Sequence, residues 1–158
     1  MLFQTTQAHE ELRAKVRAFA EEEIKPIAFM LDQQNEFPDE AIRKLGEMGL
    51  MGIPFPAEYG GAGLDALSFA YGTEEQKRKY LVPLAKGEKI GAFGLTEPNA
   101  GSDAGGTETT AVLKGDHYVL NGGKIFITNA PKADTYVVFA VTTPDIGTRG
   151  ISALIVEK

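Results

Sequence analysis

The stretch FGLTEPNAGSD, residues 93–103, combines glycines, short hydroxyl side chains and carboxylates in one segment. Gly94 and Gly101 permit close approach of the backbone to a flat or phosphorylated ligand. Thr96 and Ser102 add hydroxyl groups that reorient easily toward the heteroatoms of a ring. These residues indicate a ligand-binding loop, and an ordinary structural turn is the alternative interpretation.

The residues before this loop are typical of helices. Apolar side chains recur at spacings of three and four across residues 6–24, which predicts an amphipathic helix that Pro26 ends or kinks. Residues 37–40 (FPDE) predict the start of a second helix, with proline at the first helical position and acids in the first turn. Its expected buried stripe consists of Ile42, Leu45 and Met48.

A third helix is expected to begin near Leu64 and to stop after about two turns. Thr73 and Gln76 then form a capping box, which predicts a short helix over residues 74–84. The N-terminal part of the chain is therefore expected to be helical.

The residues after the loop are typical of short strands. Asn121-Gly122 is a strong hairpin signal, because both positions tolerate positive φ, and residues 114–116 form a second turn. We expect an α+β fold, with an N-terminal helical domain over residues 1–89 and an incomplete antiparallel β domain over residues 90–158. The expected strands cover residues 109–113, 118–120, 125–128, 136–141 and 151–156.

Composition excludes several classes of protein. The net charge of −6 argues against a nucleic-acid-binding protein, which needs a basic face. The absence of cysteine excludes disulfides, thiolate nucleophiles and cysteine-based zinc sites. The first ten residues lack a basic start and an apolar run, and no stretch has the length of a membrane span. We expect a cytoplasmic protein without membrane contact.

A second motif, NGGKIFITNA at residues 121–130, follows the first. Together they closely resemble the paired flavin-contacting signatures of the acyl-CoA dehydrogenase family. The flanking segments MGIPFPAEYGGAGLD, GTEEQKRKYLVPLAKGE and GISALIVEK also look like that family. The resemblance implies an FAD-dependent oxidoreductase of fatty acid metabolism, in which a carboxylate removes the proton alpha to the thioester while a hydride passes from the beta carbon to flavin N5.

The resemblance also implies the residues of the site. Thr96 is expected to donate a hydrogen bond near the reactive edge of the flavin, and Ser102 lies where both the flavin phosphate and the pantetheine arm of the substrate approach. Without the resemblance, Phe126 is interpreted as a core aromatic residue of a strand. The complete set of implied cofactor-binding residues is Phe93, Leu95, Thr96, Gly101, Ser102, Phe126, Ile127 and Thr128.

No residue of the chain is expected to be the catalytic base, which the family supplies from a helical domain far downstream. Glu97 and Asp103 correspond to residues that fix the loop. His9 and His117 are expected on the surface, and no second histidine or carboxylate stands at a metal-ligand spacing from either.

The sequence departs from the family between Ala70 and Tyr71, where roughly 30 residues, more than two average helices, are absent. The family's C-terminal domain is also missing. The resemblance implies an acyl-CoA substrate, an electron-transferring flavoprotein as acceptor, and a homo-oligomer, specifically a homotetramer. Two alternatives remain open: a non-catalytic flavin-binding or assembly fragment, and an oxidase or monooxygenase relative of the same fold.

Overall fold

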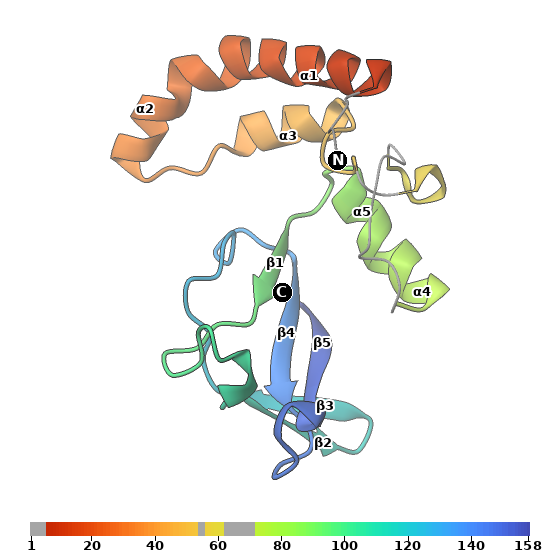
Figure 1. The fold of residues 1–158 in the computed structure, drawn as a ribbon, viewed down its shortest axis with the longest axis vertical. Helices are drawn as coiled ribbons and strands as arrows, with labels where there is room; N and C mark the ends of the chain where they lie inside the picture. The colour runs from red at the N-terminus through yellow and green to blue at the C-terminus, as the bar shows by residue number, and fades with distance from the viewer. Residues whose placement is uncertain (1–5, 54–55, 62–71) are drawn as a thin grey trace.

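The computed structural model describes residues 6–53, 56–61 and 72–158. Helices form one end of the molecule and a sheet forms the other, as Figure 1 shows. The expected third helix near Leu64 and the junction at Ala70 and Tyr71 lie outside the described residues. The α+β class is confirmed.

The first helical segment bends at a proline. Helix α1 (Gln7–Phe19) begins at a capping box in which Thr6 and His9 bond one another reciprocally. A π-helical turn (Ala20–Ile24) leads into α2 (Lys25–Gln34), whose second residue is Pro26. Because proline has no amide hydrogen and its ring crowds the preceding turn, the wider π turn lets the chain remain helical. The helix bends there instead of ending (Figure 1).

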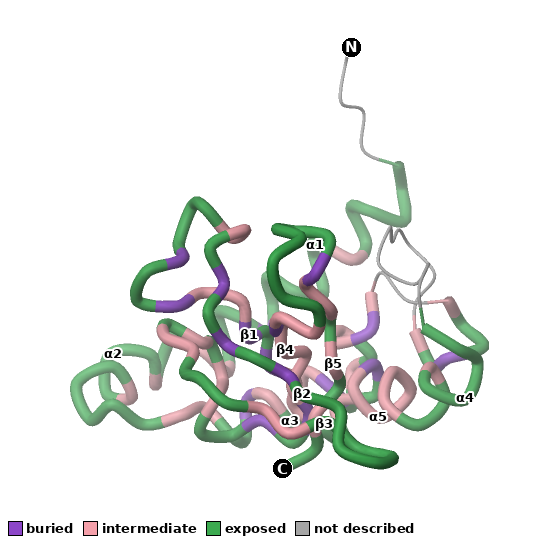
Figure 2. The backbone as a smooth tube through the Cα atoms, turned by 90° about the horizontal axis from the view of Figure 1, so that it is seen from below, coloured by how far each residue is buried: buried purple, intermediate pink, exposed green. Residues whose placement is uncertain are grey.

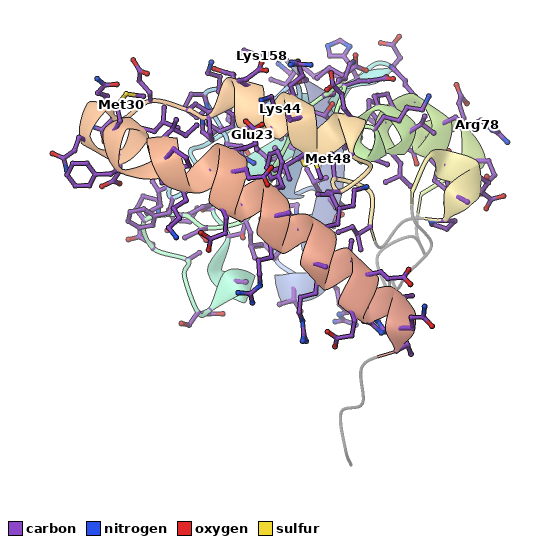
Figure 3. All side chains as sticks on the ribbon, turned by 90° about the horizontal axis from the view of Figure 1, so that it is seen from above. Glu23, Met30, Lys44, Met48, Arg78 and Lys158 are labelled. Carbon is purple, nitrogen blue, oxygen red and sulfur yellow. The ribbon has the colours of Figure 1, made fainter. Side chains whose placement is uncertain are left out.

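Helix α3 (Asp39–Glu47) returns alongside the first segment. Pro38 is its N-cap, so the helix begins at Asp39, one residue later than the sequence predicted. The ammonium group of Lys44 lies 2.6 Å from the carboxylate of Glu23, which joins α3 to the π turn (Figure 3). The predicted stripe is only partly buried: its three residues are half-exposed, whereas Ala41 and Gly46 are buried.

The second helical segment has the same arrangement of a π turn followed by a proline. The predicted capping box of Thr73 and Gln76 is confirmed at the start of α4 (Glu74–Gln76). A second π turn (Lys77–Leu81) precedes α5 (Val82–Ala85), and again a proline, Pro83, is the second residue after the turn. A short 3-10 helix (Ala57–Tyr59) precedes this segment in the chain.

Two glycines let the helical segments approach closely. A Cβ atom added to Gly87 would lie 2.6 Å from the Cα atom of Gly46, and one added to Gly46 would lie 2.8 Å from the carbonyl oxygen of Lys86. Gly87 also has a φ of +72°. The end of α3 and the end of α5 therefore meet backbone against backbone.

The sheet is built around β4 (Thr135–Val141). Strand β1 (Gly91–Gly94) pairs with β4 in parallel, and β5 (Ile151–Glu157) pairs with it antiparallel along seven residues of β4. Strands β2 (Thr110–Lys114) and β3 (His117–Asn121) form a hairpin that joins β4 through Thr110. The sheet is therefore mixed where the sequence predicted antiparallel pairing alone, because β4 pairs in parallel both with β2 and with β1, which was not predicted as a strand.

Two local predictions are wrong. Residues 125–128 form no strand, since Phe126 and Asn129 have φ values of +56° and +65° that a regular strand does not accommodate. The turn predicted at residues 114–116 is confirmed as the hairpin turn between β2 and β3, whereas Asn121-Gly122 forms no hairpin turn. Gly122, with φ of +146°, instead lets the chain leave β3 past Thr109.

The buried side chains are small. The buried apolar residues of the described chain are mostly alanines, with Phe19 and Tyr59 as the large members. Figure 2 shows buried segments confined to short stretches between exposed ones. Several aromatic side chains are exposed, including Phe29, Phe93 and Phe126. Within the described part of the chain, no helix has the length and apolar character needed to cross a membrane.

The glycine contact yields a stability prediction. Gly87→Ala is expected to lower the free energy of unfolding by about 2–4 kcal/mol, because it adds a clash with Gly46 to the strain of a positive φ. Gly115→Ala is the matched control, since Gly115 has a φ of +67° and open space around its Cα atom. That variant is expected to lose about 1 kcal/mol from strain alone. Urea denaturation of both variants measures the difference, and equal losses would contradict the close contact.

Candidate functional site

The first motif leaves the sheet at the end of β1 and turns sharply. Glu97 and Ala100 exchange two backbone hydrogen bonds of 3.1 Å, which closes a tight turn at residues 97–100. Asp103 then accepts a hydrogen bond from the amide of Gly105 and caps a 3-10 helix (Ala104–Gly106). Asp103 therefore fixes the loop locally, as expected.

Glu97 is the central polar group of this loop. Its side chain is 3% exposed, and its carboxylate accepts hydrogen bonds from the amides of Glu108 at 2.6 Å and Thr109 at 3.0 Å. The ammonium group of Lys124 lies 2.6 Å from the same carboxylate. Glu97 therefore ties its own loop to the segment that enters β2 and to the second motif, as expected of a residue that fixes the loop.

The surroundings of Glu97 determine its protonation. Burial alone raises the pKa of this carboxyl group, but hydrogen bonds from Lys124 and from the backbone amides of residues 108 and 109 outweigh it and lower the pKa to about 2. Glu97 is thus an anion at neutral pH with its acceptor sites occupied. Such a group does not serve as a general base near pH 7.

Lys124 links the two motifs directly. Besides binding Glu97, its ammonium group donates a hydrogen bond of 2.9 Å to the carbonyl oxygen of Leu95. The amide of the next residue, Ile125, donates to the carbonyl oxygen of Thr96 at 2.9 Å. Residues 95–97 and 124–125 therefore lie side by side, although 27 positions separate Glu97 from Lys124. Sequence reasoning missed Lys124, because a lone lysine after two glycines gives no signal of burial.

Phe126 has the most unusual conformation in the site. Its φ of +56° is rare for a bulky residue, and its side chain is 89% exposed. A strained backbone with an exposed aromatic ring is a feature found at functional sites. The structure does not support the alternative that Phe126 is a core aromatic residue.

The other predicted site residues vary in exposure. Phe93 is 57% exposed and packs edge to face on Phe139, with 5.1 Å between ring centroids. Gly101 lies past the turn, and a Cβ atom added to it would meet nothing within 4 Å. Leu95, Thr96 and Ile127 are half-exposed, and Ser102 and Thr128 are exposed. The structure joins residues 95–96 to residue 125 and leaves Gly101 and Ser102 on the outer part of the loop.

These features fit a flat aromatic cofactor such as a flavin. Exposed rings at positions 93 and 126 offer apolar surface, open space lies in front of Gly101, and hydroxyl groups at 96, 102 and 128 offer donors. Both histidines are exposed: His9 caps α1 and His117 bonds Asp116, as expected of surface residues. In the described ranges, no three histidine, aspartate or glutamate side chains gather as metal ligands.

A separate hollow of about 350 Å³ lies along α2 and the residues that follow it. Its lining includes Ile24, Ile27 and Leu31, with Asp32 and Glu36 at its polar side. It contains none of the predicted site residues. The chemistry of the site therefore lies in the paired loops and not in this hollow.

The buried carboxylate yields a pH-dependent prediction. Because the folded pKa of Glu97 lies below the unfolded value of about 4.3, its ionisation stabilises the fold above that value, and the contribution disappears as the pH falls toward 2. The shift corresponds to about 3 kcal/mol. The free energy of unfolding of Glu97→Gln is expected to be lower than that of the wild type by about this amount at pH 7, and the two values are expected to become equal in acid.

The measurement is urea denaturation of both proteins from pH 7 to pH 2. Asp116→Asn is the control, because it makes the same change on a fully exposed side chain and is expected to stay within about 0.5 kcal/mol of the wild type. A Glu97→Gln variant with wild-type stability at pH 7 would show that this carboxylate does not hold the loops.

Two family profiles match the chain. The acyl-CoA dehydrogenase N-terminal domain matches residues 6–71, and the acyl-CoA dehydrogenase middle domain matches residues 92–158. The short-chain specific acyl-CoA dehydrogenase of Clostridium acetobutylicum is 53% identical over 188 aligned positions, which include 100% of this chain and 50% of that protein. The alignment is 30 positions longer than the 158 residues of the chain, in agreement with the expected absence of roughly 30 residues.

Solved structures give the same result. A chain of the structure described as the electron transferring flavoprotein of Acidaminococcus fermentans is 45% identical, with a TM-score of 0.94 over 100% of this chain and 50% of that one. The FAD complex of PigA is 30% identical, with a TM-score of 0.89 over 100% of this chain and 50% of that one. The chain spans about half the length of the relatives it matches. It belongs to the acyl-CoA dehydrogenase family, of which it contains the N-terminal and middle domain regions.

Proposed function

We propose that the protein to which this chain corresponds catalyses the FAD-dependent α,β-dehydrogenation of an acyl-CoA thioester. The observation that carries the proposal is the junction of the two motifs, where Lys124 and Ile125 donate hydrogen bonds to the carbonyl oxygens of Leu95 and Thr96 and the exposed Phe126 follows with positive φ. The relative from Clostridium acetobutylicum is named a short-chain acyl-CoA dehydrogenase, and the PigA structure contains FAD. Both names support the reaction and the cofactor.

The residues around the junction have separate roles in this proposal. When bound, FAD supplies the chemistry of hydride acceptance. Phe93, Leu95 and Phe126 give apolar surface to its ring system, while Thr96 and Thr128 donate hydrogen bonds to its polar edges. The remaining members of the set, Gly101, Ser102 and Ile127, border the ring and the thioester, and Ser102 also binds the substrate.

The base for the alpha proton lies outside this set. Glu97 is an anion with a pKa of about 2 whose oxygens already accept hydrogen bonds, and Asp103 caps a 3-10 helix. Proton removal from a thioester needs a placed base of higher pKa. We therefore assign no catalytic residue to this chain.

We also propose an electron-transferring flavoprotein as the electron acceptor and a homo-oligomeric, specifically homotetrameric, assembly. The structure described as an electron transferring flavoprotein supports the first part. A cytoplasmic location remains an expectation. A monomer in light scattering would contradict the proposed assembly. Full activity of the complete protein with oxygen as sole acceptor would contradict the proposed acceptor and favour the oxidase alternative.

A second candidate is a non-catalytic flavin-binding or assembly role for the chain itself. The alignment with the Clostridium relative favours it, because 30 of its 188 positions have no counterpart among the 158 residues here. The two candidates share the flavin loops and differ in whether a base-bearing region accompanies them. The intact mass of the native protein together with its full reading frame separates them.

Cofactor binding is testable on the 158-residue chain. Titration with FAD is expected to shift amide resonances of residues 93–96 and 126–128 in ¹⁵N-resolved NMR spectra. Thr96→Ala is expected to weaken this binding by roughly 2- to 10-fold, the effect of one lost hydrogen bond. Thr110→Ala, a change at an exposed residue of β2, is the control and is expected to bind like the wild type. Shifts spread evenly over the chain, or unchanged affinity of Thr96→Ala, would contradict the assigned site.

The 158-residue chain is expected to show no dehydrogenase activity, because general-base assistance is worth roughly 10²–10⁴-fold and no base is placed. The assay combines the chain, FAD, saturated acyl-CoA thioesters of several lengths and a dye as acceptor. Dye reduction that depends on the chain and disappears in Glu97→Gln would overturn both the missing base and the loop-fixing role of Glu97.

A further inference from the structure

We propose that Lys124 is a positioning residue of the flavin site, which holds Phe126 in its exposed, left-handed conformation beside Leu95 and Thr96. The ligand in this statement rests on the proposed function, whereas the positioning of Phe126 is a property of the chain alone. Lys124 touches no reacting atom and acts through the backbone.

The side chain of Lys124 crosses the end of β1. A Cβ atom added to Gly94 would lie 3.6 Å from Cγ of Lys124, so the aliphatic stem lies against that glycine. The ammonium group then reaches the carbonyl oxygen of Leu95 at 2.9 Å and the carboxylate of Glu97 at 2.6 Å. Its side chain is 10% exposed. The lysine therefore contacts residues 94, 95 and 97 of the first motif.

Other lysine ion pairs of the molecule are more exposed to solvent than the pair of Lys124 and Glu97. Lys132, for example, lies 2.8 Å from Asp39, but its side chain is 45% exposed. Exposed pairs of this kind contribute little, because solvent screens the charges and ordering the side chains opposes the contact. A buried ammonium group with two acceptors fixes geometry, since removing it leaves the buried carboxylate of Glu97 without its cation and takes a donor from the carbonyl oxygen of Leu95.

Phe126 lies between two anchors. On its N-terminal side are the contacts of Lys124 and the hydrogen bond from the amide of Ile125 to Thr96. On its C-terminal side the amide of Ala130 bonds the carbonyl oxygen of Ile127, and the side chain of Asn129 reaches the carbonyl oxygen of Gly91. A bulky residue adopts positive φ only where its surroundings determine it. Loss of the first anchor is therefore expected to release Phe126.

The experiment compares Lys124→Met, which keeps the stem and removes the charge, with Lys132→Met as the matched control. In Lys124→Met the amide of Ile125 is expected to exchange with solvent at least roughly tenfold faster, because its segment opens more readily. The FAD-induced shifts at residues 126–128 are expected to disappear. Lys132→Met is expected to match the wild type in both measurements.

The double variant Glu97→Gln/Lys124→Met separates positioning from charge balance. The double variant contains neither charge of the buried pair, so its urea midpoint is expected to return toward the wild-type value. The backbone amide of Ile125 is expected to exchange with solvent as fast as in Lys124→Met. If Lys124→Met does not fold, the double variant alone decides the proposal. The proposal is overturned if the amide of Ile125 in the double variant regains wild-type protection from exchange together with the urea midpoint. It is also overturned if that amide in Lys124→Met exchanges within about twofold of the wild-type rate. Absence of FAD shifts in the wild type would contradict the proposed function, while the exchange measurement still decides the role of Lys124.

Discussion

The site depends on a buried negative charge that must be fully paired. Removing a carboxylate from water carries a large free-energy penalty unless hydrogen bonds and a cation replace the lost hydration. Glu97 obtains these from two backbone amides and Lys124, which come from separate segments of the chain. Satisfying one side chain therefore brings three segments to fixed positions, and the geometry of both motifs follows from that requirement.

The rest of the fold supports the site with close backbone packing. Gly46 and Gly87 let the ends of α3 and α5 meet, and Gly122 lets the chain leave β3 past Thr109. The buried apolar side chains are mostly alanines, so the described part of the chain has little large apolar volume to bury. The aromatic rings of Phe93 and Phe126 are exposed instead, in the two motifs, where they are available to a flat ligand.

Much of this arrangement could be predicted from the sequence where the signals are local. The capping box of Thr73, the strands at 136–141 and 151–156, and the roles of Glu97 and Asp103 depend on neighbouring residues or on the family motif. The failures involve contacts distant in sequence. Strand β1 forms because β4 pairs with it, and Phe126 leaves strand geometry under the contacts of Lys124 and Ile125.

The residues that fix the loops differ from the residues that are available to a ligand. Glu97 and Lys124 have their partners within the chain, whereas the ring of Phe126 is exposed. The central claim, that Glu97 is a buried and fully paired anion, is tested most directly by titrating its side-chain carboxyl carbon in ¹³C NMR spectra of the folded chain. A pKa of about 2 is the result expected from its partners. A pKa near 4.5, the ordinary value, would contradict the account, because it would mean that the carboxylate neither binds Lys124 nor organises the two motifs.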